Sequence, residues 1–194
     1  HNTSMKIVLA SSSKYRKTQL TNLGYSFESH NPNIDETRFD EENPQELVDR
    51  LAKEKARSVS VLYPESIVIS GDQVATYQDH VLGKPLNRDR AIESLTMVSG
   101  QKVVFLSAAC VKTPTYEYHH IEPTTALFRK LTSEEIGNYI DLDEPYDCAG
   151  SFRSEKLGLH LLENLNSNDP SALMGLPLIW LCIILRQIGI NPLN

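Results

Sequence analysis

The 194-residue sequence lacks the signatures from which an activity is most often recognised. The P-loop pattern G-x-x-x-x-G-K-[ST], the dinucleotide pattern G-x-G-x-x-G, the nucleophile elbow G-x-S-x-G and the zinc pattern H-E-x-x-H are all absent. Its three cysteines, Cys110, Cys148 and Cys182, are far apart and include no C-x-x-C pair. A disulfide framework and a cysteine zinc site are therefore not expected, and a reducing cytoplasm is the expected compartment.

The chain also has no apolar run long enough to cross a bilayer, which takes about 20 residues in a helix. Its most apolar stretch, residues 173–185, is interrupted by Gly175 and Pro177. We expect a buried helix in this part of the chain and no association with a membrane.

Positive charge is in deficit, with 19 Lys and Arg against 25 Asp and Glu and a formal net charge of −6. A protein that binds duplex nucleic acid must neutralise many phosphates at once, so no nucleic-acid partner is expected. A small anionic ligand is compatible with this charge, because a local pocket can oppose the sign of the whole surface.

What the sequence does contain is the composition of a globular protein, with 40% hydrophobic and 23% charged residues. A chain of this length can bury about 70% of the surface that its unfolded form exposes, which is enough for one sizeable core. We expect a single domain with two lobes over residues 5–194. Residues 1–4, which precede Met5, are expected to be a remnant of cloning and not part of the fold.

Apolar periodicity and capping residues predict alternating strands and helices, and therefore an α/β domain with a mixed sheet. The expected strands are residues 6–10, 25–29, 66–70, 102–112, 121–129 and 159–163. The expected helices are residues 14–23, 43–62, 87–98, 132–142 and 177–188. The strand 66–70 is expected to end at Gly71, so that Asp72 lies just beyond its carboxyl end.

A cluster of polar residues stands between the first strand and the first helix, where Ser11, Ser12 and Ser13 precede Tyr15 and Arg16. Backbone N–H groups at a helix start, together with hydroxyls and a guanidinium, suit a phosphate group. Simple capping of the helix by one serine explains the same pattern equally well.

A lysine interrupts the apolar face of the helix 43–62. Lys55 falls in the stripe formed by Val48, Ala52, Val59 and Leu62, and lysine is rarely buried without a partner. Its stem can pack while the amine reaches water. We favour the other reading, in which the ammonium points into a cleft at an anion.

Three further residues stand where strands and loops can present them to a ligand. Asp72 follows a buried strand, which is where open α/β sheets bind ligands, although a Gly-Asp turn is also a common structural feature. Lys84, between Gly83 and Pro85, can hold a point charge on a phosphate. The acidic run at residues 35–50 is mostly a solvated face, yet a carboxylate such as Glu36 suits Mg²⁺. Together these residues predict a cleft for a metal-bound polyphosphate.

Seven short blocks occur in an order that is similar to the Maf family of nucleotide pyrophosphatases, over essentially the full length from Met5. These blocks are residues 9–16, 35–36, 51–56, 71–74, 83–85, 148–152 and 175–178. The resemblance implies a mixed central β-sheet flanked by helices with a cleft between two lobes, similar to the inosine-triphosphate pyrophosphatases, and frequent homodimers. It also implies hydrolysis of the α–β phosphate bond of a nucleoside triphosphate with a divalent metal cation such as Mg²⁺ or Mn²⁺.

The resemblance also assigns roles to individual residues. The proton acceptor of the family falls on Asp72, and its phosphate-binding residues fall on Ser11, Arg16, Lys55 and Lys84. An aspartate with an ordinary pKa of about 3.9 is a weak base at neutral pH. A metal that acidifies the attacking water would share this task, with Glu36 and Asp72 as its expected ligands.

Three positions bear on the base of the nucleotide. Tyr15, Gln73 and Glu155 resemble the 7-methyl-GTP pyrophosphatase subgroup, whereas members that cleave dTTP or UTP typically show Arg, Thr and Gln at these places. An aromatic face at position 15 can stack on the cationic methylated guanine, and Glu155 can accept its N1–H and N2–H donors. Lys14 and Lys156 depart from the subgroup, in which proline and glycine are usual.

Two alternatives stay open. Besides a 7-methyl-GTP pyrophosphatase, the sequence is compatible with a pyrophosphatase for other nucleotides, of the dTTP or UTP type or otherwise modified. It is also compatible with a non-enzymatic nucleotide-binding regulator of septum formation. The complete set of charged residues favours an enzyme, because a protein that only binds a nucleotide has no need of a positioned base.

Overall fold

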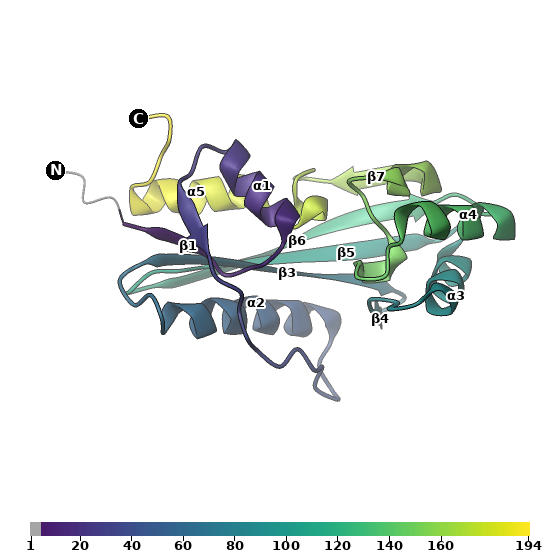
Figure 1. The fold of residues 1–194 in the computed structure, drawn as a ribbon, viewed down its shortest axis with the longest axis horizontal. Coiled ribbons are helices and arrows are strands. Elements are labelled where there is room, and N and C mark those ends of the chain that lie inside the picture. The colour runs from purple at the N-terminus through teal and green to yellow at the C-terminus, as the bar shows by residue number, and fades with distance from the viewer. Residues whose placement is uncertain (1–4) are drawn as a thin grey trace.

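The computed structural model describes residues 5–194, and the four residues predicted to be a cloning remnant lie outside this range. Seven strands form one mixed sheet that runs the length of the molecule (Figure 1). The strands are β1 (Ile7–Leu9), β2 (Phe27–Ser29), β3 (Ile67–Tyr77), β4 (His80–Leu82), β5 (Lys102–Lys112), β6 (Glu117–Phe128) and β7 (Leu162–Ser167). Their order is β2-β1-β3-β5-β6-β7, with β4 also paired to β3. The predicted mixed α/β sheet is thus confirmed.

Helices cover both faces of this sheet (Figure 1). They are α1 (Lys14–Asn22), α2 (Pro44–Ser60), α3 (Arg88–Val98), α4 (Ser133–Asp143) and α5 (Leu178–Ile188). One core cluster lies between the sheet and α2, a second lies on the opposite face under α1 and α5, and a third lies at the far end with α3 and α4. Within residues 5–194, no helix combines the length and apolar character needed to cross a membrane.

β3 is longer than the sequence predicted. It does not end at Gly71 but continues through Asp72 to Tyr77, because β5 pairs with it without a break from Val68 to Thr76. On its other edge, the parallel partner β1 ends opposite Ile69, and pairing with the antiparallel β4 starts at Ala75, opposite Leu82. Asp72 therefore lies in mid-strand, within a stretch of β3 that has no strand beside it on this edge.

Side chains along this open stretch alternate between the two faces of the sheet, as the pleat of a strand requires. Ser70 donates a hydrogen bond to the carbonyl oxygen of Ala52 in α2, and Val74 packs in the same cluster as α2. Gly71 and Gln73 face the opposite side, toward the segment at residues 172–176. The open edge of β3 is thus reached from both faces.

Two further predictions were wrong. The expected strand at 159–163 is instead a 3-10 turn at Leu157–Leu161, tied by the Leu157 N–H to Asp143 Oδ2 at 2.9 Å, and β7 begins only at Leu162. The expected buried helix at 173–185 is α5, which buries only one side, because Ile179 and Ile183 are exposed.

Candidate active site

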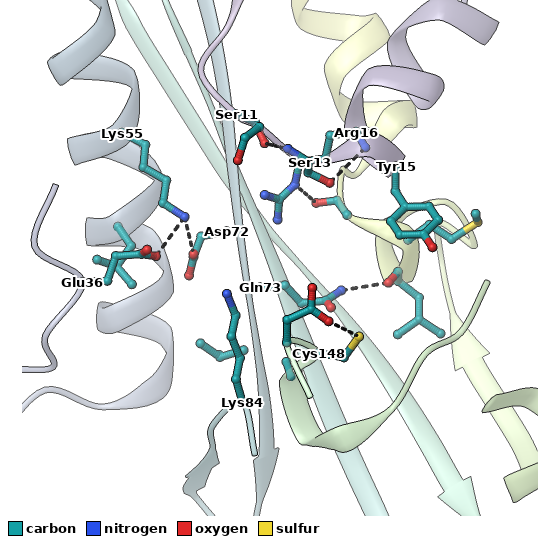
Figure 2. A pocket seen from close by; sticks show the side chains of 18 of the residues that line it. Ser11, Ser13, Tyr15, Arg16, Glu36, Lys55, Asp72, Gln73, Lys84 and Cys148 are labelled. Atoms are coloured by element: carbon teal, nitrogen blue, oxygen red, sulfur yellow. Dashed lines mark hydrogen bonds and ion pairs between the residues drawn. The ribbon is translucent and has the colours of Figure 1, made fainter. Parts of the chain in front are cut away.

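A cavity of about 660 Å³ opens at the unpaired edge of β3 (Figure 2). Its walls come from the β1–α1 connection, from α2, from the loop after β4 and from the segment at residues 147–155. All of the site residues predicted from the sequence line it: Ser11, Tyr15, Arg16, Glu36, Lys55, Asp72, Gln73, Lys84 and Glu155. The volume lies within the range of about 300–1,000 Å³ that is usual for small-molecule sites.

Two of the serines in the β1–α1 connection have separate tasks. Ser13 is the N-cap of α1, since its Oγ accepts the N–H of Arg16 at 3.3 Å. Ser11 is buried, and its Oγ accepts the N–H of Ser13 at 3.0 Å. A hydroxyl that accepts still has a proton to donate. Because Ser13 provides the cap, Ser11 is free to donate to a ligand.

Arg16 is held in a narrow space between two glycines. Its Nε donates to the carbonyl oxygen of Gly175 at 3.3 Å. A Cβ on Gly71 would lie 3.1 Å from Arg16 Nε, and one on Gly175 would lie 2.9 Å from Arg16 Cγ. Burial lowers the pKa of Arg16, and the charges of Asp72 and Glu36 oppose this effect. Arginine stays charged in proteins, so the site contains a fixed cation at this point.

Lys55 joins the two carboxylates of the site. Its Nζ lies 2.9 Å from Asp72 Oδ1 and 3.1 Å from Glu36 Oε1 (Figure 2). The lysine stands at the rim of the buried face of α2, and Leu62, which was expected to continue that face, lies beyond the helix and is exposed. The ammonium points into the cleft, as predicted, and not to the bulk solvent.

Asp72 is a buried carboxyl in the site. Burial raises its pKa, while the ammonium of Lys55 and the guanidinium of Arg16 oppose the rise and the charge of Glu36 adds to it. Its Oδ2 is buried and has no hydrogen-bond partner within residues 5–194. Buried polar atoms are normally paired, so this oxygen is suited to a water or a cation that arrives with the ligand.

The two carboxylates can hold a hard divalent cation, and waters or substrate phosphates would supply its remaining ligands. Within residues 5–194, no group of three or more His, Cys, Asp or Glu residues could hold a metal ion. Mg²⁺ is often bound by one or two carboxylates together with substrate phosphates. Asp72 Oδ2 and the half-exposed Glu36 match this arrangement.

Tyr15 and Glu155 meet at another part of the cavity. Burial and the carboxylate of Glu155 raise the pKa of Tyr15, and Arg153 opposes the rise. Arg153, which the sequence reasoning missed, also lines the cavity and donates from Nη2 to the carbonyl oxygen of Glu144 at 3.2 Å. Its only signal in the sequence was its place two residues before Glu155.

Gln73 uses its amide nitrogen inside the protein. Nε2 donates to Ser107 Oγ and to the carbonyl oxygen of Leu173, both at 3.0 Å. The single proton of the Ser107 hydroxyl goes to the carbonyl oxygen of Ala172 at 2.7 Å, so the atom of Gln73 that faces Ser107 must be a donor. Only the carbonyl oxygen of Gln73 is therefore available to a ligand.

Lys84 completes the ring of cations. It lies in the loop between β4 and α3, is exposed, and is directed toward Asp72 in Figure 2. No ion pair involves its ammonium within the described chain. A mobile point charge of this kind can follow a phosphate group as it moves.

Comparison with known proteins now decides the family. The family model described as Maf-like protein matches residues 6–188. The chain belongs to this family. A relative from Idiomarina loihiensis is 44% identical over 98% of both chains, and one from Nitrosococcus oceani is 48% identical over 94% of this chain and 93% of its own. Both are named 7-methyl-GTP pyrophosphatase. Among solved structures, the Staphylococcus aureus Ham1 protein covers 79% of this chain and 89% of its own with a TM-score of 0.47 and 13% identity.

The two departures from the subgroup pattern are both exposed in this Maf-like protein. Lys14 is the first residue of α1, a position that proline favours but does not require. Lys156 lies outside the cavity lining. Its backbone has φ −127° and ψ −124°, which is outside the regions that residues with a Cβ commonly adopt, so glycine suits this position better than lysine.

Proposed function

We propose that this Maf-like protein hydrolyses the α–β phosphate bond of 7-methyl-GTP and releases 7-methyl-GMP and pyrophosphate. The observation that carries the proposal is the convergence of Arg16, Lys55, Lys84 and Asp72 on one cavity. Three cations suit a triphosphate, and a buried carboxyl beside them suits a proton acceptor. The names of the relatives support the same reaction and the same nucleotide.

The cations hold the triphosphate and stabilise the charge that develops on its oxygens. Arg16 provides two-pronged contacts from a fixed position, and Ser11 donates its hydroxyl proton nearby. Lys55 and Lys84 approach from the opposite walls, α2 and the loop after β4. These contacts orient the α-phosphorus toward the open edge of β3.

Asp72 removes a proton from the attacking water. The water oxygen forms a bond to the α-phosphorus, the bond from that phosphorus to the α–β bridging oxygen breaks, and pyrophosphate leaves with the electron pair. The proton passes to the Asp72 carboxylate, whose raised pKa makes it a stronger base than an ordinary aspartate. A divalent cation held by Asp72 Oδ2 and Glu36 would acidify the water and neutralise phosphate charge when bound.

The base of the nucleotide lies against Tyr15 and Glu155. Methylation at N7 gives guanine a positive charge, which the face of Tyr15 attracts. The carboxylate of Glu155 accepts the N1–H and N2–H donors and offsets the charge. The free carbonyl oxygen of Gln73 is a further acceptor for the guanine base. Thymine and uracil have no pair of adjacent donors that corresponds to N1–H and N2–H of guanine.

A direct comparison of nucleotides tests the substrate. With Mg²⁺ present, kcat/KM for 7-methyl-GTP should exceed the values for GTP, dTTP and UTP by tenfold or more, measured as pyrophosphate release. The double variant Tyr15→Arg with Glu155→Gln should lower this preference. An unchanged preference in the double variant would refute the assignment of the base-binding residues.

A second experiment tests Asp72 as the proton acceptor and distinguishes an enzyme from a nucleotide-binding regulator. Asp72→Asn should lose about 10²–10⁴-fold in kcat, which is the usual contribution of general acid–base catalysis, while it keeps most of its nucleotide affinity. Wild-type turnover in this variant would exclude Asp72 as the proton acceptor. A wild-type protein that binds the nucleotide but releases no pyrophosphate would be a regulator.

A further inference from the structure

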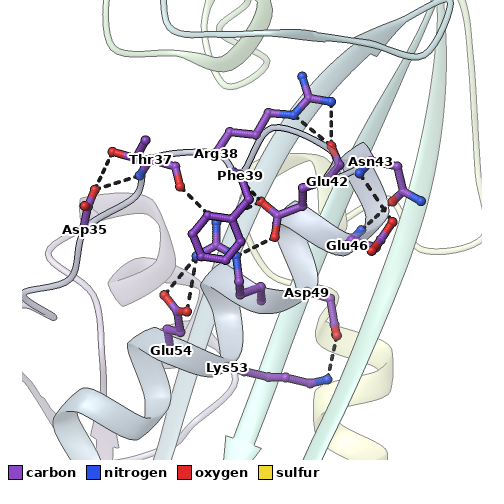
Figure 3. A network of polar contacts seen from close by, with 11 residues as sticks. Asp35, Thr37, Arg38, Phe39, Glu42, Asn43, Glu46, Asp49, Lys53 and Glu54 are labelled. Carbon is purple, nitrogen blue, oxygen red and sulfur yellow. Dashed lines mark hydrogen bonds and ion pairs between the residues drawn. The ribbon is translucent and has the colours of Figure 1, made fainter.

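Glu36 reaches the site on a segment that has no regular secondary structure. We call residues 35–42 the Glu36 strap; they precede α2 and contain neither helix nor strand. A segment without its own backbone ladder must take its position from side-chain contacts with the rest of the fold. Several of those contacts involve one residue of α2 outside the cavity lining, Arg50. Figure 3 shows the strap residues Thr37, Phe39 and Glu42 in this network beside α2.

Arg50 forms an ion pair with Glu42, the last residue of the Glu36 strap. Its Nε lies 2.5 Å from Glu42 Oε2 and its Nη2 lies 2.9 Å from Oε1, which makes a two-pronged ion pair. Glu42 is buried, with 8% of its surface exposed, although the acidic run was expected to be mostly a solvated face. Arg50 lowers the pKa of Glu42, so the carboxyl is ionised at neutral pH.

The same guanidinium also reaches the middle of the strap. Arg50 Nη2 donates to the carbonyl oxygen of Thr37 at 3.1 Å, and the ring of Phe39 covers the guanidinium with its centroid 3.9 Å from Cζ. Thr37 directly follows Glu36 in the chain. Arg38 adds two hydrogen bonds to the carbonyl oxygen of Glu42, at 2.9 and 2.7 Å. The strap is therefore fixed at its end, at its centre and next to Glu36.

We propose that Arg50 is a positioning residue that acts on the metal site through the Glu36 strap. With Glu42 and Thr37 held on α2, the carboxylate of Glu36 stays 3.1 Å from Lys55 and beside Asp72. Without this grip, Glu36 would have to be ordered by the incoming cation itself. The inference rests on the proposed function, because it takes Glu36 as one of the two metal-ligating carboxylates.

The test measures Mn²⁺ binding to the nucleotide-free protein. Binding is monitored through the electron paramagnetic resonance signal of the Mn²⁺ that stays free. Groups that orient metal ligands typically contribute about 10–100-fold to metal affinity, so Arg50→Ala should weaken Mn²⁺ binding about tenfold. Glu42→Gln, which keeps the size of the side chain but loses its charge, should weaken binding in the same direction. In a Glu36→Gln background, Arg50→Ala should have no further effect.

The chain offers a matched control on the same helix. Arg57 makes a two-pronged ion pair with Glu117, with both contacts at 2.7 Å, but it links α2 to β6 and not to the strap. Arg57→Ala should leave Mn²⁺ affinity unchanged. Amide hydrogen exchange at residues 37–42 should accelerate in Arg50→Ala and not in Arg57→Ala.

Four results would overturn the inference. The first is a wild-type protein that does not bind Mn²⁺, and the second is an unchanged Mn²⁺ affinity in Arg50→Ala. The others are an equal loss in Arg57→Ala and an effect of Arg50→Ala that persists in full when Glu36 is already replaced. If the protein binds Mn²⁺ but cleaves no nucleotide, the proposed function fails and the role of Arg50 is still decided by the binding data.

Discussion

Replacing Gly71 by alanine tests whether Arg16 depends on the narrow space between Gly71 and Gly175. The added Cβ would stand 2.6 Å from Leu176 Cδ2, 3.1 Å from Arg16 Nε and 3.3 Å from the carbonyl oxygen of Ala108. The last of these atoms belongs to the backbone of β5 and cannot yield. Leu176 is fully buried, so it can move only at the expense of its own packing, and Arg16 must be displaced.

The structure sets the size of both expected effects. Inserting a methyl group into a packed interior typically costs about 1–3 kcal/mol. We expect Gly71→Ala to lower the free energy of unfolding by about 2 kcal/mol and Tm by about 4–8 °C for a chain of this size. A displacement of about 1 Å in a positioning group can cost about 100-fold in rate. The 3.1 Å contact requires Arg16 Nε to move by only a few tenths of an ångström. Since Arg16 is proposed to hold the triphosphate, kcat/KM should fall, but by less than that factor.

The assay is pyrophosphate release at a temperature where thermal unfolding shows the variant to be folded. Gly137→Ala is the matched control: its Cβ would lie 3.3 Å from Arg88 Nη2, the end of a flexible side chain, and alanine is a better helix former than glycine within α4. This control should keep wild-type kcat/KM and should not lower Tm. Wild-type kcat/KM in Gly71→Ala would refute the reasoning, because Arg16 would then not depend on the glycine.

Three more outcomes are expected. Lys55→Met should bind Mn²⁺ more tightly than the wild-type protein at pH 8 in the absence of nucleotide, because it frees both carboxylates, while hydrolysis falls at least 100-fold; weaker Mn²⁺ binding would contradict a shared site. Burial raises the pKa of Asp72, and the charge of Glu36 raises it further. As the pH is lowered, Asp72 should therefore become protonated, and kcat/KM should begin to fall, at a pH above the ordinary aspartate pKa of about 3.9. Glu36→Gln should move this fall to lower pH, and a pH profile of kcat/KM that stays in place would argue against the coupling. Cys148 is half-buried and lines the cavity, and this partial burial raises the pKa of its thiol to about 12. Mass spectrometry should therefore find it slow to react with iodoacetamide at pH 8, and rapid alkylation would contradict the raised pKa.

The sequence predicted the residues of the cavity better than the strand that presents them. Gly71 and Asp72 belong to residue types that are depleted in strands, so the pattern favoured a turn after Ser70. The pairing with β5, more than thirty residues away, overrides this local preference. By contrast, the start of α2 was predicted correctly, because the capping box of Asn43 and Glu46 is a local signal.

The residues that were missed act through contacts that no local pattern encodes. Arg50 lies in an acidic stretch that looks like a solvated face, and only the folded strap brings Glu42 and Thr37 to its guanidinium. Arg153 was passed over because its neighbour Glu155 carried the subgroup resemblance. The environment of Lys55 could be anticipated, since a lysine in an apolar stripe calls for a partner, but not which carboxylates would provide it.

The alternation along the open edge of β3 limits how this protein can vary in length. Asp72 faces α2 and Gln73 faces the segment at residues 172–173. The proposed proton acceptor and the proposed base-binding amide are therefore neighbours in the chain that point to opposite faces of one strand. Deleting a single residue between Ile69 and Gly71 would exchange these two faces. Insertions and deletions among relatives should therefore be confined to loops such as the Gln78–Asp79 turn. In β3, the number of residues between Ile69, the last paired with β1, and Ala75, the first paired with β4, should stay constant.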